Sequence, residues 1–258
     1  MRFLLPPSPG FDVAQQHAPL LQAALRVTVP ALVVEVAPTY TALGDDVIAD
    51  RCIAAWVPPI VGSRIEMAGG RIVRRAVRGG QTAYRAGLVC RAGETLDLAK
   101  ATTLTAVWVD EDSAAGYLLA RSWLASRHVD AINGFKRATF SHSYVACLEA
   151  VADGRADVCS VFASVAGAKV TSTLDEVDPA LASRLQIVHH TGDTQTDGVA
   201  VGARVTDETV APLLEALTRL PSTPAGAAVF HRLMQCDALH VEAQRPTSLA
   251  LQALLTMG

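Results

Sequence analysis

The sequence predicts an α/β protein of two similar lobes, each with a mainly parallel sheet flanked by helices. Short apolar runs alternate with segments whose apolar residues recur at helical spacing, a pattern typical of buried strands between helices. The series of elements in about the first 90 residues recurs in about the next 100, which indicates two lobes. No Pro/Ser-rich linker separates the halves, so we expect crossing strands to join them.

The first series of elements starts at the N-terminus. Residues 2–5 form an apolar run that Pro6 and Pro7 end, which predicts a buried strand. Residues 11–25 carry apolar side chains at helical spacing and predict a helix. Three further β-rich apolar runs predict the remaining strands of this series, at residues 31–36, 53–57 and 83–90.

The second series opens with a strand at residues 104–109 and a helix at residues 114–126. A helix over residues 143–152 meets a stop signal at Asp153-Gly154. The other expected strands are residues 137–140, 156–162, 185–189 and 198–201. The other expected helices are residues 206–220, with Thr206 or Asp207 as cap, 224–234 and 248–255.

Composition and charge narrow the class of partner. The chain has 258 residues, of which 50% are hydrophobic and 18% charged, with a formal net charge of -3. These values are typical of a globular protein and favour neither nucleic acid nor an anionic membrane as partner. The densest basic group is Arg71, Arg74, Arg75 and Arg78, which we interpret as a solvated surface face.

Cysteines and the N-terminus bear on the compartment. Five cysteines without C-x-x-C spacing, several of them among apolar residues, favour a reducing environment. Prolines end the first apolar run after three residues, too early for a secretory signal, and no run has the ~18 apolar residues of a membrane span. We therefore expect a cytoplasmic protein as written, or a periplasmic one if a leader has been removed.

The segment most informative about function follows the strand expected at residues 104–109. A polar turn carries Asp110, Glu111, Asp112 and Ser113, and a helix starts near Ala114. The first N–H groups of a helix have no partner within it, and with the helix dipole they favour an anionic or polar ligand group. Ser113 either adds a hydroxyl to this cradle or only caps the helix, which is the commoner role.

This turn, in the order Asp-x-x-Ser-x-x-Gly-Tyr-Leu, resembles that of the phosphate, phosphite and phosphonate substrate-binding proteins of ABC transporters. That family typically has Ser-Thr-Ser-Gly where this chain has Ser113-Ala114-Ala115-Gly116. The first serine and the glycine match, and the two inner hydroxyls are absent. The resemblance implies a type 2 periplasmic-binding-protein fold with a ligand crevice between two lobes.

Further segments resemble the same family in order and distance. Residues 139–158 are similar to its Phe-x-Gly-x-His, helix, Gly-x-x-Asp block, with His142 displaced by one position and Ser143 in the histidine column. Tyr84 lies in a Gly-x-x-x-Tyr strand, and Tyr40 lies in a loop whose tyrosine faces the ligand in the family. Asp197 stands where the family returns to the first lobe with an acidic residue.

The resemblance implies lobes of residues 1–88 with 196–258, and 89–195. It also implies a solute-binding protein or sensor that clamps a small polar or anionic, phosphonate- or phosphate-like molecule, with an ABC transporter or regulatory partner. From the residues themselves we expect no metal, cofactor or membrane insertion. The implied ligand-binding residues are Tyr40, Tyr84, Ser113, Ala114, Ala115, Gly116, Tyr117, His142, Ser143 and Asp197.

Several of these residues also have structural interpretations. Tyr84 and Tyr117 could be core residues, His142 could cap the following helix, and Asp197 could hold a turn through Gly198. The absent hydroxyls and the apolar Phe162-Ala163 favour a less charged or more apolar ligand than a phosphonate.

Two other functions stay open. One is a cytoplasmic enzyme on the same scaffold, such as a chorismate dehydratase-like lyase, with Asp112, His142 or Asp197 as base. The other is a partner-binding module without a ligand. The binding protein is favoured over the enzyme.

Overall fold

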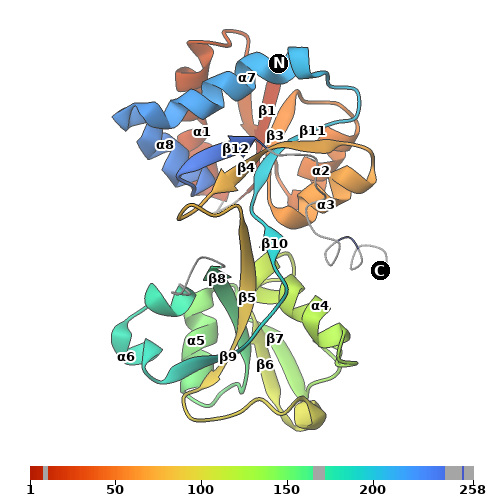
Figure 1. The fold of residues 1–258 in the computed structure, drawn as a ribbon, viewed down its shortest axis with the longest axis vertical. Coiled ribbons are helices and arrows are strands. Elements are labelled where there is room, and N and C mark those ends of the chain that lie inside the picture. The colour runs from red at the N-terminus through yellow and green to blue at the C-terminus, as the bar shows by residue number, and fades with distance from the viewer. Residues whose placement is uncertain (8–10, 165–171, 242–251, 253–258) are drawn as a thin grey trace. The chain divides into compact units, whose positions relative to one another are not determined.

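The computed structural model describes residues 1–7, 11–164, 172–241 and 252. The chain folds into two compact units, unit 1 from Met1–Thr82 and Gln195–Gly258 and unit 2 from Ala83–Thr194 (Figure 1). The chain passes from unit 1 to unit 2 just before strand β5 (Ala83–Arg91), whereas the expected boundary at residue 88 lies inside this strand. The whole strand belongs to unit 2 because it pairs along its length with two strands of that unit.

Unit 1 is built on a six-stranded sheet in the order β12-β4-β11-β3-β1-β2. Strand β1 pairs in parallel with β2 and β3, whereas β11 and β12 make antiparallel pairs. The strands are β1 (Arg2–Leu5), β2 (Val33–Val36), β3 (Ala54–Val57), β4 (Arg71–Val77), β11 (Gly198–Val201) and β12 (Ala238–Val241). The sheet is therefore mixed, since the segment that returns from unit 2 enters it antiparallel between β3 and β4.

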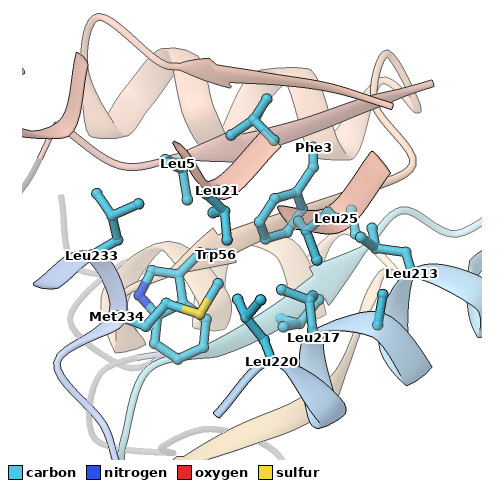
Figure 2. Packing of buried hydrophobic residues seen from close by; sticks show 14 of the residues in the cluster. Phe3, Leu5, Leu21, Leu25, Trp56, Leu213, Leu217, Leu220, Leu233 and Met234 are labelled. Carbon is cyan, nitrogen blue, oxygen red and sulfur yellow. The ribbon is translucent and has the colours of Figure 1, made fainter. Parts of the chain in front are cut away.

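Helices cover both faces of this sheet. They are α1 (Phe11–Arg26), α2 (Tyr40–Ile48), α3 (Pro59–Met67), α7 (Asp207–Arg219) and α8 (Pro224–Met234), with a 3-10 turn η4 (Leu220–Ser222) after α7. One face packs on α1, α7 and α8 through Phe3, Leu21 and Leu217, each 0% exposed (Figure 2). The other face packs on α2 and α3 through residues such as Leu43 and Ile65.

Unit 2 also has mixed pairing. Strand β5 pairs antiparallel with β8 and β9, and β6 pairs in parallel with β7. The strands are β6 (Thr105–Trp108), β7 (Arg137–Phe140), β8 (Cys159–Ser164) and β9 (Leu185–His190), and the short β10 (Thr194–Gln195) spans the boundary with unit 1. The helices are η1 (Leu98–Thr103), η2 (Ala114–Leu118), α4 (Leu119–Ala125), α5 (Tyr144–Ala152), η3 (Thr173–Asp175) and α6 (Pro179–Ala182).

The two-lobed α/β architecture predicted from the sequence is confirmed. Four elements of unit 1 were missed: α2, α3, β4 and β12. The interpretation of the basic group as a solvated face is wrong, because these arginines lie on or next to β4 and Arg75 is 1% exposed. The helix expected at residues 248–255 lies outside the described residues apart from residue 252. None of the described helices combines the length and apolarity needed to cross a membrane.

All five cysteines are free and buried, which predicts low thiol reactivity in the folded protein. Burial raises the pKa of Cys52 and of Cys236 to about 12. At pH 8 a thiol with that pKa is roughly one part in 10⁴ thiolate, the form that reacts. We expect a disulfide reagent such as DTNB to titrate five thiols in guanidinium but almost none within minutes in the native protein. Rapid reaction of native thiols would contradict this burial.

Candidate functional site

The polar turns of unit 2 lie at one edge of its sheet. Strands β6 and β7 run parallel, and a parallel bridge between Ala106 and Val158 aligns the chain leading into β8 with them. The carboxyl ends of these strands therefore share an edge. Tyr84, near the start of the antiparallel β5, pairs with Ser164 at the end of β8 and lies at the same edge. Ligands of α/β proteins bind at such edges.

The turn after β6 leads directly into a helix start. The Ser113 hydroxyl accepts a hydrogen bond from the Gly116 amide at 3.1 Å, so Ser113 is the N-cap of η2. Its backbone carbonyl accepts from Tyr117 and Leu118. The amides of Ala114 and Ala115 donate to none of the described residues, as first-turn amides do. Capping and the cradle of unpaired amides thus coexist here.

Gly116 allows this helix start to lie against β6. Its carbonyl accepts from the Val109 amide at 3.3 Å, which holds the first turn against the end of the strand. A Cβ at position 116 would lie 2.5 Å from the Val109 Cβ and 2.7 Å from the Ser113 Oγ. Only glycine fits this approach, which explains the residue type without reference to a ligand.

The turn after β7 lies beside the first turn. The Ser141 amide donates to the Trp108 carbonyl at 2.9 Å, and the His142 amide donates to the Val109 carbonyl at 2.7 Å. Ser143 then caps α5, its hydroxyl accepting from the Ala146 amide at 3.4 Å. Two capped helix starts of unit 2 are therefore joined by backbone hydrogen bonds.

His142 has a left-handed backbone, with φ of 59°, and its side chain is 74% exposed. Its Nδ1 lies 2.9 Å from Asp110 Oδ2 across the two turns. It does not cap α5, since Ser143 has that role. No Lys or Arg occurs in residues 109–118 or 140–147, so His142 is the single side chain of these two segments that can become cationic.

The electrostatics of this edge are mixed. The helix starts favour an anion, whereas Asp110, Glu111 and Asp112 oppose one. Burial raises the pKa of Asp112, and the charges of Asp110 and Glu111 raise it further. A ligand with one negative charge therefore suits the edge better than a dianion.

Two of the three tyrosines of unit 2, Tyr84 and Tyr117, are buried. Tyr117 packs against Trp108 and Phe140, with ring centroids 6.0 and 5.1 Å away, and burial raises its pKa. Tyr84 is 5% exposed and lies 5.4 Å from the Phe162 ring. These contacts agree with the core interpretation of both rings, and Tyr84 also lies at the strand edge.

Tyr40 and Asp197 belong to unit 1. Tyr40 is the first residue of α2, which Thr39 caps through the Ala42 amide at 3.0 Å, so it begins a helix and is not in a loop. Asp197 directly precedes β11, whose Gly198 pairs with Val57 at the end of β3. Both residues therefore lie at the carboxyl edge of the parallel strands.

Asp197 forms an ion pair with Arg78, which the sequence analysis named only as part of the basic group and not as a site residue. Arg78 also donates through Nε to the Gln235 carbonyl at 2.7 Å. Arg78 directly follows β4, a segment that was not expected to be a strand. No local signal in the sequence identifies this pair, because Arg78 and Asp197 are 119 positions apart.

A family model described as "ABC transporter, phosphonate, periplasmic substrate-binding protein" matches residues 10–241. A search of the curated proteins finds no match to this chain.

Solved structures with the same fold are distant in sequence. A binding protein component of an ABC phosphonate transporter from Pseudomonas aeruginosa is 18% identical, with TM-score 0.68, over 99% of this chain and 84% of that one. A Xanthomonas citri protein solved with ATP is 16% identical, with TM-score 0.76, over 99% and 96%. A Prochlorococcus marinus protein, PhnD1, in complex with methylphosphonate is 15% identical, with TM-score 0.68, over 100% and 96%.

Proposed function

Since the chain belongs to the family of periplasmic substrate-binding proteins of phosphonate ABC transporters, we propose that it binds a small anion at the Ser113 and Ser143 helix starts of unit 2. The observation that carries this proposal is the pair of adjacent capped turns, in which the Ala114 and Ala115 amides donate to none of the described residues. Amides at a helix start bind phosphonate, phosphate or carboxylate oxygens.

The ligand class follows from what the turns lack. Ala114 and Ala115 supply no hydroxyl, no Lys or Arg is in either segment, and the acidic turn is adjacent. A phosphonate dianion needs more donors and positive charge than these segments offer. We therefore expect a phosphonate-like monoanion with an apolar substituent. Phe162 of β8, which packs on Tyr84, supplies an apolar surface for that substituent.

Calorimetry with three probes tests this ligand class. We expect methyl methylphosphonate, a monoanion, to bind more tightly than methylphosphonate or inorganic phosphate at pH 7.5. Tightest binding of methylphosphonate would overturn the monoanion assignment while leaving the site itself intact. If none of the three raised the melting temperature, the site would be in question, because a ligand of the folded state must stabilise it.

Ser113→Ala is the direct test of the site. Loss of the cap costs about 1 kcal/mol of stability, and loss of the ordered helix start and hydroxyl should weaken binding roughly tenfold or more. Thr206→Ala is the matched control, because Thr206 caps α7 in unit 1 through the Thr209 amide. The control should lose similar stability but no affinity. Equal affinity in both variants would exclude Ser113 from the site.

The other residues implied by the resemblance have predicted roles. We assign Gly116 to the approach of helix and strand, Tyr84 to an aromatic wall, and His142 to hydrogen bonding or charge. We assign the buried Tyr117 to packing against Trp108 and Phe140, which stabilises the turn at Ser113. For Tyr40 and Asp197 in unit 1, ligand binding stays a prediction, and Asp197 is held by its ion pair with Arg78.

Delivery to an ABC importer is the physiological role we propose, and the ligand is released unconverted. Mass spectrometry of the bound probe after incubation distinguishes this from a lyase, since conversion would change its mass. The family is described as periplasmic, and we propose that compartment over the cytoplasmic one expected above. Osmotic-shock fractionation of the native host checks it.

A further inference from the structure

A cavity separate from the site proposed above lies within unit 1, between strand β4 and helix α7. Its volume is about 590 Å³, in the range of small-molecule pockets. Apolar side chains, among them Val73, Leu214 and Val241, form one part of its lining. Arg74 also lines the cavity.

A β-bulge turns Arg74 toward this cavity. On the neighbouring β11, Val199 pairs with Arg74 and Ala200 pairs with Ile72, so Val73 is the extra residue. Val199 belongs to the core beneath α7, whereas Ile72 and Ala200 belong to the core beneath α2 and α3. Paired residues of adjacent strands share a face. Without the bulge, strict alternation would place Arg74 on the same face as Ile72.

Arg74 has no anionic partner among the described residues. Its Nη1 donates to the Val73 carbonyl at 2.8 Å, and its buried Nε has no hydrogen-bond partner. Burial lowers its pKa, because desolvation disfavours the cation. By contrast, Arg71 pairs with Asp207 and Arg219 pairs with Glu215 at the rim of the same cavity. The charged lining is thus three cations and two anions, which leaves one positive charge.

From this charge balance and the apolar lining, we propose that the cavity between β4 and α7 is a second ligand site, for an organic monocarboxylate with an apolar chain. The carboxylate pairs with the Arg74 guanidinium and neutralises it, and the chain lies against Val73, Leu214 and Val241. The site is independent of the helix starts of unit 2, because it lies wholly in the other unit.

Octanoate is the probe, with octylammonium and 1-octanol as controls of equal chain length. We expect calorimetry on the full chain to give saturable octanoate binding and no comparable binding of octylammonium. Arg74→Leu should weaken octanoate binding roughly tenfold or more, the usual effect of losing a hydrogen bond to a charged group. Arg232→Ala, which removes an exposed arginine of α8, should leave it unchanged.

Ala211→Phe provides a second, steric test that does not depend on the arginine. Ala211 is exposed and lines the cavity, so a phenyl ring there fills it while leaving the core intact, and octanoate binding should be lost. Absent octanoate binding in the wild type, unchanged binding in both variants, or equal binding of octylammonium would each overturn the proposal. Loss of octanoate binding in Ser113→Ala would instead place octanoate at the unit 2 site and overturn it too.

Discussion

Gly116→Ala is expected to lower the free energy of unfolding by about 3 kcal/mol, the upper part of the range for overpacking a well-packed site. Glycine to alanine in an open helix position stabilises by about 1 kcal/mol through helix propensity. Here the steric effect is larger, because the new Cβ would lie 2.5 Å from both the Cβ and Cγ2 of Val109. The Val109 Cβ is fixed by the backbone directly after β6, so no side-chain rotation relieves its contact.

The same substitution should abolish binding at the site we propose. To relieve the clash the first turn of η2 must move away from β6, and the Ala114 and Ala115 amides move with it. A displacement of this kind weakens every hydrogen bond to a small ligand at once. Titration of methyl methylphosphonate by calorimetry at a temperature where the variant is folded measures this loss separately from the loss of stability.

Gly192→Ala is the matched control in the same unit. A Cβ at position 192 meets nothing within 4 Å, so its effect on stability should stay within about 0.5 kcal/mol. Urea denaturation of both variants gives the comparison. If Gly116→Ala were as stable as Gly192→Ala and bound ligand normally, the close approach of η2 to β6 would not limit the residue at 116.

Arg75→Met is the second large effect, with an expected loss of about 3 kcal/mol in the free energy of unfolding. Arg75 is 1% exposed, lies 3.6 Å from Glu66 and donates to the Thr196 carbonyl at 3.0 Å. Removing the cation leaves the Glu66 carboxylate, 13% exposed, without this counter-charge. It also removes a donor that holds the chain where it re-enters unit 1.

Arg71→Met on the same strand is the control. Arg71 pairs with Asp207, whose side chain is 89% exposed, so the loss should be about 1 kcal/mol or less. The double variant Arg75→Met/Glu66→Met should recover part of the stability, because it also removes the carboxylate that has lost the Arg75 counter-charge. Similar stability of Arg75→Met and Arg71→Met in urea denaturation would show that the buried pair contributes no more than a surface one.

Local patterns determined much of this protein. The apolar runs predicted the parallel strands β1, β2 and β3 of unit 1, because strands buried on both faces have continuous apolar sequence. The Asp-x-x-Ser-x-x-Gly-Tyr-Leu segment located the helix start at Ser113 and Ala114, since capping is a property of a few adjacent residues. The resemblance carried by that segment also gave the family that the comparison supports.

Local apolar patterns did not predict elements with polar sequences. Strand β4 contains Arg71, Arg74 and Arg75 and has no apolar alternation, yet it pairs with β11 and β12 on its two sides. Two of its arginines bind groups more than 100 residues away, Arg71 the Asp207 carboxylate and Arg75 the Thr196 carbonyl. Partners so distant in sequence leave no local signal.

The sequence by itself thus determined the two-lobed α/β class, the family and the capped turn at Ser113. Only the tertiary structure decided that His142 meets Asp110, that Asp197 is held by Arg78, and that a bulge directs Arg74 away from Ile72. The physical reason is the range of the interactions. Periodicity and capping act over a few residues, whereas strand register and the pairing of buried charges depend on which distant segments become neighbours.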